Sequence, residues 1–183
     1  LAWWAPDEHR LALALDATSL AQRFTVLAIS VVYRGCAIPI AWTVLNGTEA
    51  NAWKPHWLNL LQRLTDSIPS TWSVIVLADR GLYAHWLFDQ IVQLHWHPFL
   101  RINRDGKFRT DQCDYRPLSS LVVPDAPPWC GRVVCFKARP LTCTLLAYQD
   151  TIHEDPWLVI TDLLPDQAQV CWYGLRTWIE CGF

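Results

Sequence analysis

The sequence has no segment typical of a membrane or secreted protein. Its longest stretch without Asp, Glu, Lys or Arg covers residues 35–48, and these 14 residues are too few to span a bilayer. No basic leader followed by an apolar run opens the chain, so we expect no signal peptide. The seven cysteines form no CxxC pair, which argues against a zinc site and indicates reduced thiols in a cytosolic protein.

Methionine is also absent, and the chain begins with Leu1. We therefore expect these 183 residues to be a piece of a longer reading frame. Charged residues make up 17% of the chain and hydrophobic residues 52%, a balance that excludes a disordered protein. The length fits one domain with a sizeable insertion.

Two features of the composition are unusual. Residues 101–139 carry eight Lys and Arg against four Asp and Glu, a local charge of +4, whereas the rest of the chain carries −6. A basic segment in an acidic frame fits a surface that faces phosphates, and a solvated β-region is the alternative. The 12 tryptophans fit packing or, alternatively, stacking on bases or sugars, for which Trp129 is the best candidate.

Short apolar segments predict the strands of a sheet. Residues 11–15 and 74–78 are continuous apolar runs, typical of central strands that are buried on both faces. Residues 23–33 and 36–45 predict a hairpin, and Pro39 places the second of its strands at an edge of the sheet. A further strand is expected over residues 97–102.

Helical periodicity is confined to three segments. Apolar side chains recur at helical spacing in residues 55–64 and 83–94, and a last helix is expected over residues 167–180. Residues 103–165 contain proline pairs, turns and short strands, which predict a β-rich insertion. This order of elements describes an α/β fold with a mixed sheet and helices on its faces, in which ligands bind at the carboxyl ends of the parallel strands.

An aspartate directly follows each of the two buried strands. If these strands lie side by side and parallel, Asp16 and Asp79 emerge close together at one edge of the sheet. Two carboxylates held this close repel each other unless one is protonated or a cation lies between them. Hard oxygen ligands suit Mg²⁺ or Mn²⁺. The alternative for each aspartate is that it only starts a turn or caps a helix.

The last helix adds a third acidic residue. At about 100° per residue, Tyr173, Arg176 and Glu180 fall within about 60° of one another, opposite an apolar face that includes Cys171 and Leu175. We therefore expect this helix to bury the apolar face and to present the tyrosine, the arginine and the glutamate together. An ordinary amphipathic helix with an Arg–Glu pair is the alternative.

These residues resemble a known signature. The spacing Tyr173-x2-Arg176-x3-Glu180 is similar to the YREK signature of bacterial insertion-sequence DDE transposases. The segment from Asp79 to Tyr83 (DRGLY) resembles the D-x-G-x-[Y/F] motif around that family's second catalytic aspartate, and Asp16 matches the first. The resemblance covers nearly the whole chain.

The resemblance implies an RNase H-like mixed sheet flanked by helices, with a β-rich insertion before the last catalytic helix. Residues 1–102 then form the first part of the catalytic core, residues 103–165 the insertion, and residues 166–183 the last catalytic helix, truncated at its C-terminus. The family's Lys is expected seven residues after Glu180, beyond Phe183, and only 15 residues precede Asp16, too few for the family's N-terminal DNA-binding region.

The resemblance also implies an activity. Asp16, Asp79 and Glu180 would be catalytic and would hold two Mg²⁺ or Mn²⁺ ions, which activate water or a DNA 3′-hydroxyl for attack on phosphodiesters. Tyr173 and Arg176 would grip DNA phosphates. The implied function is metal-dependent DNA strand cleavage and strand transfer in cut-and-paste transposition. The expected partner is double-stranded DNA, both transposon ends and target, bound by a dimer of the full-length protein in the bacterial cytoplasm, at the nucleoid and not at a membrane.

A metal cluster alone cannot hold a long polyanion, so we expect phosphate contacts from the basic segment as well. Its candidates are Arg101, Arg104, Lys107 and Arg109, which we predict to lie on the same side of the molecule as the carboxylates. Three alternatives to a transposase stay open. They are an RNase H-like nuclease that only hydrolyses, a transposase relic that binds without cutting, and a non-catalytic Trp-rich module that binds sugar or protein.

Overall fold

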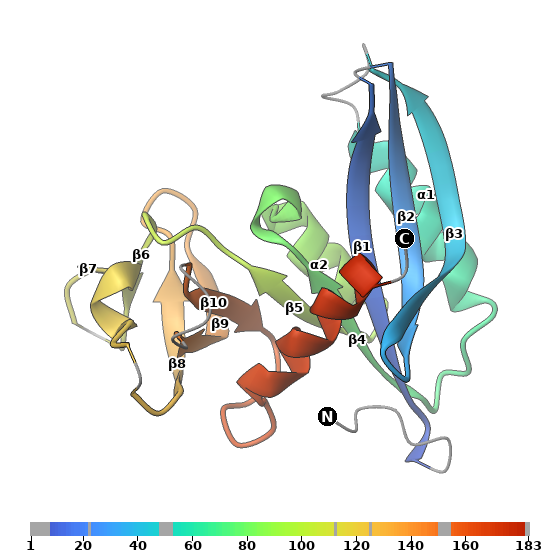
Figure 1. Cartoon of the computed structure of the whole chain (residues 1–183). Helices are drawn as coiled ribbons and strands as arrows, with labels where there is room; N and C mark the ends of the chain where they lie inside the picture. Colours follow the sequence, from blue (N-terminus) through green and yellow to red (C-terminus); the bar gives the residue numbers. More distant parts are fainter. Residues whose placement is uncertain are drawn as a thin grey trace.

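The computed structural model describes residues 8–21, 23–47, 53–111, 113–124, 126–149 and 155–181, except for the side chains of Glu180 and Cys181. In these residues, ten strands hydrogen-bond into one mixed sheet in the order β3-β2-β1-β4-β5-β10-β9-β8-β6-β7 (Figure 1). The predicted α/β architecture with a mixed sheet is therefore confirmed.

The first three strands form a long antiparallel ribbon. They are β1 (Arg10–Leu20), β2 (Phe24–Tyr33) and β3 (Cys36–Asn46). Gly35, with a φ of 89°, allows the tight turn between β2 and β3 because it has no Cβ to clash in the left-handed region. Pro39 lies on β3, which is an edge strand as predicted, since a proline has no N–H to offer a second neighbour.

Two parallel strands continue the sheet on the other side of β1. They are β4 (Ser73–Ala78) and β5 (His97–Arg101). The parallel pairing of β1 with β4 ends at Leu15 opposite Ala78. β1 therefore lies at the centre of the fold, and its apolar run is buried on both faces as predicted, because helices cover both faces of the sheet there.

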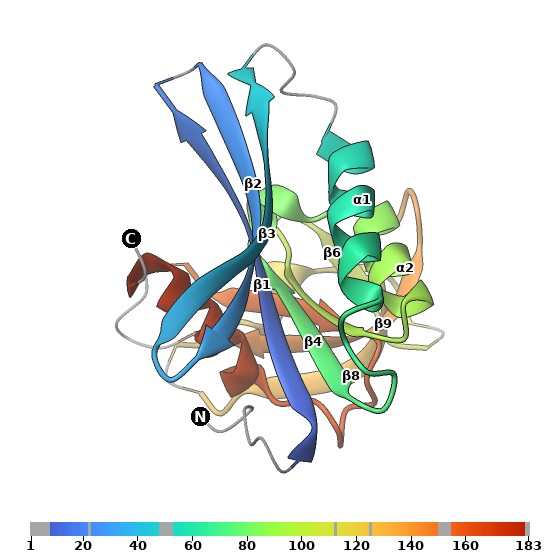
Figure 2. The same cartoon turned by 90° about the vertical axis from the view of Figure 1, so that its right-hand side faces the viewer.

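One face carries the helices α1 (Trp53–Thr65) and α2 (His85–Gln93). The short 3-10 helix η3 (Arg80–Leu82) joins β4 to α2. The other face carries the 3-10 helix η5 (Val170–Cys181), as Figure 2 shows. Side chains of β1 alternate between the two cores. Leu13 and Leu15 pack with α1 and α2, whereas Ala12 and Ala14 pack with η5.

The β-rich region joins the same sheet instead of forming a separate layer. Its elements are β6 (Lys107–Arg109), β7 (Arg116–Pro117), the 3-10 helix η4 (Leu118–Leu121), β8 (Trp129–Cys135), β9 (Leu141–Tyr148) and β10 (Trp157–Thr161). The link is β10, which pairs antiparallel to β5 with Val159 opposite Arg101. Backbone hydrogen bonds therefore run without interruption from the ribbon to the far end of the molecule.

The last helix differs from its prediction in its start and in the face that it buries. It begins at Val170, and Tyr173 is only 3% exposed whereas Cys171 is exposed. The reason is the 3-10 geometry, in which side chains three residues apart align. The row of Tyr173, Arg176 and Ile179 faces inward, so the prediction that Tyr173 lies opposite the buried face and Cys171 on it was wrong.

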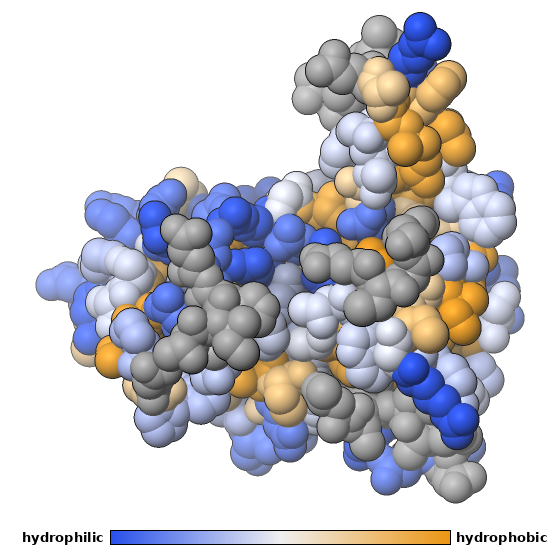
Figure 3. All heavy atoms as spheres, viewed as in Figure 1, coloured by the Kyte–Doolittle hydropathy of each residue, from blue (hydrophilic) through white to orange (hydrophobic). Residues whose placement is uncertain are grey.

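On the face shown in Figure 3, the two ends of the molecule differ in polarity. Hydrophobic residues gather over the ribbon, whereas the end formed by the β-rich region is mostly hydrophilic (Figure 3). The exposed apolar residues of the ribbon are Leu20, Phe24, Ile38, Ile40, Trp42 and Val44. Among the described residues, we find no helix that is both long and apolar enough to cross a lipid bilayer.

Candidate functional site at the ends of β1 and β4

The structure brings Asp16 and Asp79 together. The parallel ladder ends with Leu15 opposite Ala78, and each aspartate is the next residue along its strand. Asp16 continues the alternation of Ala12 and Ala14, so its side chain faces the η5 side of the sheet. Two carboxylates thus occupy neighbouring positions just beyond the end of the parallel ladder, under the last helix.

Asp16 does not end its strand, contrary to the prediction. β1 continues to Leu20, and residues 16–20 pair with β2 alone, with Asp16 opposite Ala28. The apolar run ends at Leu15 because the parallel partner ends there, and β1 then becomes more exposed, from the partly buried Asp16 to the exposed Thr18. Asp16 therefore lies where β1 separates from β4.

Arg176 of η5 contacts the first carboxylate. Its guanidinium lies 3.5 Å from Asp16 Oδ1, and the two side chains are only 15% and 23% exposed. Asp16 Oδ2 accepts a hydrogen bond of 2.7 Å from the Thr18 hydroxyl. Sequence reasoning missed Thr18, although its position two residues along a strand places it on the same face as Asp16.

Arg101 of β5 contacts the second carboxylate. Its guanidinium lies 3.7 Å from Asp79 Oδ1 and also donates to the backbone carbonyls of Asp155 and Pro156, at 3.3 and 3.1 Å. The start of β10 therefore fixes this arginine. Each carboxylate has one guanidinium beside it, so these four groups together carry no net charge.

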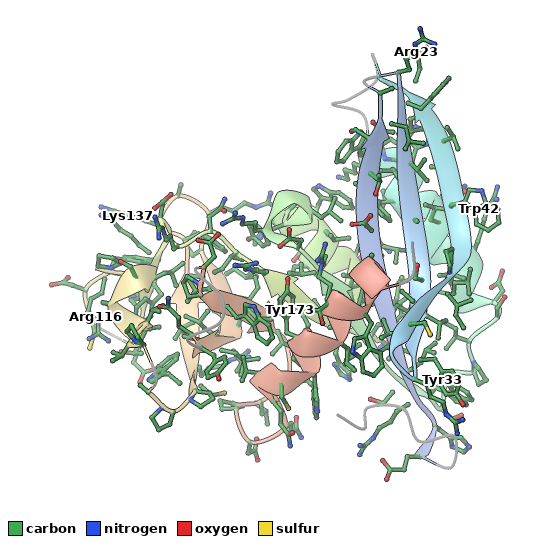
Figure 4. The ribbon with its side chains drawn as sticks, in the orientation of Figure 1. Arg23, Tyr33, Trp42, Arg116, Lys137 and Tyr173 are labelled. Atoms are coloured by element: carbon green, nitrogen blue, oxygen red, sulfur yellow. The ribbon has the colours of Figure 1, made fainter. Side chains whose placement is uncertain are left out.

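Tyr173 of η5 lies at the centre of the molecule, near Asp79, Arg101 and Arg176 (Figure 4). Its hydroxyl donates to the carbonyl of Ala78 at 3.5 Å, and its ring meets Trp157 edge to face at 5.4 Å. Burial raises the pKa of Tyr173 above its ordinary value, and Asp79 adds to this, while Arg176 and Arg101 oppose it. The tyrosine is therefore a neutral hydrogen-bond donor at neutral pH.

A pocket of about 170 Å³ opens at the two aspartates. It is lined by Asp16, Ala17, Trp53, Asp79, Gly81, Leu82 and Arg176. Asp79 Oδ1 and Arg176 Nε are buried without a hydrogen-bond partner. A buried carboxylate oxygen that accepts no hydrogen bond, beside a second carboxylate, fits a hard divalent cation.

The third predicted carboxylate cannot be placed. Glu180 belongs to η5, but its side chain lies outside the described residues. In the part of the chain that is described, no three His, Cys, Asp or Glu side chains form a group that could hold a metal ion. The roles of Asp16, Asp79 and Glu180 as catalytic residues and metal ligands therefore stay predictions.

The predicted phosphate contacts are spread over the molecule. Arg101 lies in the site, whereas Arg104 and Lys107 are exposed. Arg109 lies on β6 with its guanidinium 5.5 Å from the centre of the Tyr115 ring. Four strands separate β6 from β4 in the sheet. The same basic segment places Arg116 at the end of the molecule opposite the ribbon (Figure 4).

Trp129 has a packing partner in the structure. Its ring lies 6.1 Å from that of the buried Phe108 and covers Gly131, where an added Cβ would come within 2.8 Å of the indole. A different tryptophan, Trp53, lines the acidic pocket, and its indole N–H is buried without a partner. Sequence reasoning missed Trp53, because nothing in its local spacing distinguishes it from the other tryptophans.

The fold and the site thus define a mixed α/β sheet with an acidic pair at its parallel strand ends. In sequence, the chain matches no protein-family model and no curated protein. In structure, it is similar to a chain in the cryo-EM structure of the piggyBac transposase synaptic complex with hairpin DNA, with a TM-score of 0.50 and 11% identity. The match covers 94% of this chain and 39% of that chain, so the chain spans well under half of the transposase chain. At this identity, the likeness concerns the fold.

Proposed function

We propose that this chain is part of the catalytic domain of a DNA transposase of the DDE type, with an RNase H-like core. One observation carries the proposal. Asp16 and Asp79 lie at neighbouring positions where two adjacent parallel strands part, under a helix that brings Arg176 and Tyr173 to them. The structural likeness to a transposase chain supports the same class.

The residues of the pocket fit divalent metal ions. Asp16 and Asp79 would hold Mg²⁺ or Mn²⁺, and Glu180 is the third ligand that the YREK resemblance implies. Bound metal would supply Lewis-acid stabilisation of charge on the attacking and leaving oxygens of a phosphodiester. Asp79 Oδ1 is buried and accepts no hydrogen bond, and its ion pair with Arg101 is long, at 3.7 Å, which favours a cation as its ligand.

The two arginines would act first as internal counter-charges and then as phosphate ligands. Arg176 and Arg101 neutralise the aspartates in the structure. If a cation takes over the carboxylates, the guanidinium groups are free to bind phosphate oxygens, for which their planar fork is suited. Tyr173, a buried neutral donor, would keep both arginines oriented and the pocket closed to water from below.

The substrate that we propose is double-stranded DNA. Arg104, Lys107 and Arg109 would add phosphate contacts beyond the pocket. Replacing one that touches phosphate should weaken binding to every sequence alike and reduce the salt slope of log K by about one unit. Strand cleavage and strand transfer would use one site, since only the nucleophile changes, from water to a DNA 3′-hydroxyl.

Metal binding tests the proposal on the chain itself. We expect Mn²⁺ to bind wild type, as measured by electron paramagnetic resonance, and Asp16→Asn and Asp79→Asn to abolish this binding. Asp66→Asn is the matched control, because Asp66 is an exposed carboxylate just after α1. Equal Mn²⁺ binding by all four proteins would contradict the proposal.

Activity is tested on the protein from its complete reading frame. Nicking or joining of plasmid DNA should require Mg²⁺ or Mn²⁺, stop in EDTA, and disappear in Asp16→Asn, Asp79→Asn and Glu180→Gln while DNA binding persists. A strand-transfer assay distinguishes a transposase from an RNase H-like nuclease, since cleavage without joining would favour the nuclease. Full cleavage by a variant that combines all three amide substitutions would refute both enzymatic functions.

A further inference from the structure

The outer strand of the ribbon has an open edge. β3 is the terminal strand of the sheet, and among the described strands it pairs with β2 alone (Figure 1). Residues 36–46, which form β3, contain no charged side chain. Proteins commonly place charge on an exposed edge strand, because charge keeps the strand from pairing with another chain. This edge lacks that protection and is a template for a further strand.

Only the first half of the edge is blocked. Pro39 offers no N–H, and a bulge shifts the register of the β2–β3 pair between Ile29 and Ser30. The next seven residues, 40–46 (IAWTVLN), contain no proline, no glycine and no charge, and several of them are strong strand formers. These are the features of a segment that pairs readily with another strand. Pairing is therefore confined to the second half of β3.

The hydrogen-bond pattern shows which backbone groups point outward. The N–H of Gly47 donates to the carbonyl of Arg23 on β2, at 2.6 Å. Because the direction of these groups alternates along an antiparallel strand, Thr43, four residues earlier, also points toward β2. The N–H and C=O groups of Trp42 and Val44 then point away from β2, toward the side on which no described strand lies.

The side chains of the same two residues are suited to a copy of themselves. Trp42 is 62% exposed and Val44 57% exposed, and they lie opposite Ala28 and Val26 of β2, on the face of the sheet away from α1. In an antiparallel pair of β3 strands with Thr43 at a two-fold axis, each Trp42 lies opposite the partner's Val44. Pairs of an aromatic and a β-branched side chain, and of two threonines, stabilise antiparallel strands.

A groove beside the edge enlarges the apolar surface. It has a volume of about 340 Å³, and its lining includes Ile40 and Trp42 of β3 and Leu60, Arg63 and Leu64 of α1. A strand that joins β3 covers this groove and buries apolar atoms of α1 as well. Arg63 is exposed, so its charge can remain in water while its stem lies along the groove.

We propose that the second half of β3 is a self-association surface, at which a second copy of this chain adds its own β3 antiparallel and continues the sheet across a two-fold axis at Thr43. Two observations favour an identical chain as the partner. An uncharged strand brings no repulsion to its own copy, and the pairing of Trp42 with Val44 is self-complementary, as a two-fold interface requires. This contact needs neither DNA nor metal, so the inference does not rest on the proposed function.

The expected dimer is weak, because the contact is small. We expect a dissociation constant on the order of 10 µM, so that dilute protein is monomeric. Sedimentation equilibrium in EDTA, without DNA and from about 1 to 100 µM chain, should show the change from monomer to dimer. Val44→Glu should raise the dissociation constant at least about tenfold, because it places a charge beside Trp42 in both symmetric pairs.

Val123→Glu is the matched control, because Val123 is 58% exposed and belongs to the β-rich region, far along the sheet from β3. It should associate like wild type. Circular dichroism establishes that each variant is folded, and Trp42→Glu, also at an exposed position, replaces Val44→Glu if that variant is not.

A cross-link tests the register. Across the axis, the two Thr43 residues form a pair without mutual hydrogen bonds, with Cα atoms about 4.5 Å apart, within the range of a disulfide. Thr43→Cys should therefore give a covalent dimer when oxidised glutathione takes up the two electrons and the two thiol protons. Thr142→Cys, at an exposed position on β9 with strands on both sides, should not. Both variants are made with serine in place of Cys36, Cys113, Cys171 and Cys181.

Three results would overturn the inference. They are a wild type that stays monomeric at about 100 µM, association of Val44→Glu as strong as that of Val123→Glu, and a dimer in which Thr43→Cys cross-links no better than Thr142→Cys. The last result would place the contact on another surface or with another register.

Discussion

Arg176 and Asp16 form an ion pair between residues 160 positions apart in the chain. The pair joins the last helix to the central strand and leaves both side chains less than a quarter exposed. Removing one partner of a partly buried pair leaves the other charge uncompensated, so the coupling between the two residues is expected to make a larger contribution here than in a surface pair.

A double-mutant cycle measures that contribution. We predict that Arg176→Met and Asp16→Asn each lower the free energy of unfolding, with a coupling energy of about 1 kcal/mol from urea denaturation in EDTA. Arg80 and Asp155 are the control pair. They are closer, at 2.8 Å, but 48% and 39% exposed, so their coupling should be only a few tenths of a kcal/mol. A larger coupling energy for the exposed pair would show that burial does not determine the strength of these ion pairs.

The buried Tyr173 and the half-buried Tyr83 should make stability fall at alkaline pH. Burial raises the pKa of Tyr173 and of Tyr83, so both stay protonated in the folded state after the unfolded chain has lost these protons. Their stabilisation is complete below pH 10, the unfolded pKa, and is lost as the pH rises from there toward the folded pKa. Tyr173 should steepen the fall of the unfolding free energy by about 1.4 kcal/mol per pH unit.

Tyr173→Phe should therefore make the unfolding free energy less sensitive to pH above 10, as measured by urea denaturation across a pH series. Tyr33→Phe is the control, since Tyr33 lies at the end of β2 and is less buried than Tyr173, which is 3% exposed. An unchanged pH profile for Tyr173→Phe would mean that its hydroxyl titrates normally.

The described cysteines should differ in their reactivity toward Ellman's reagent. Cys36, Cys113 and Cys171 are exposed and should react at once, whereas Cys135 and Cys143 are buried and should react only after unfolding. A hydrogen bond with Cys143 and burial both raise the pKa of Cys135, which further suppresses its thiolate. Rapid labelling of Cys135 in the native protein would contradict the burial of β8 against β9.

Core and edge positions of the sheet should respond very differently to truncation. Leu13 is fully buried at the centre of β1, and Leu13→Ala should cost about 2–5 kcal/mol of stability because it leaves a cavity. Val44 is 57% exposed on β3, and Val44→Ala should change stability by no more than about 0.5 kcal/mol. Thermal denaturation of the two variants gives the comparison, and similar losses would place β3 inside an interface.

Much of the central fold could be predicted from the sequence, because local patterns decide it. The apolar run before Asp16 predicts a strand buried on both faces, and Pro39 predicts the edge. Each signal depends on neighbouring residues alone. Because side chains alternate between the two faces of a strand, Asp16 is then expected on the same face as Ala14.

The site was less predictable, because its contacts join distant segments. Arg101 could be seen only as a basic residue, and its place beside Asp79 depends on how β5 pairs with β4 and β10. The burial of Tyr173 depends on the 3-10 geometry of η5, which a sequence read at 100° per residue does not reveal. Trp53 can be recognised as a residue of the site only from the structure, because it lines the same pocket as Asp79.

The distance along the chain between Asp16 and Arg176 also orders events in time. During synthesis at roughly 5–20 residues per second, the ribosome needs on the order of ten seconds to add the residues between them. Until η5 emerges, β1 can pair with β2, but Asp16 has no guanidinium beside it and Tyr173 has not closed the face below. The acidic pocket is therefore among the last parts of this chain to form, and the nascent protein carries the carboxylates long before it carries the site.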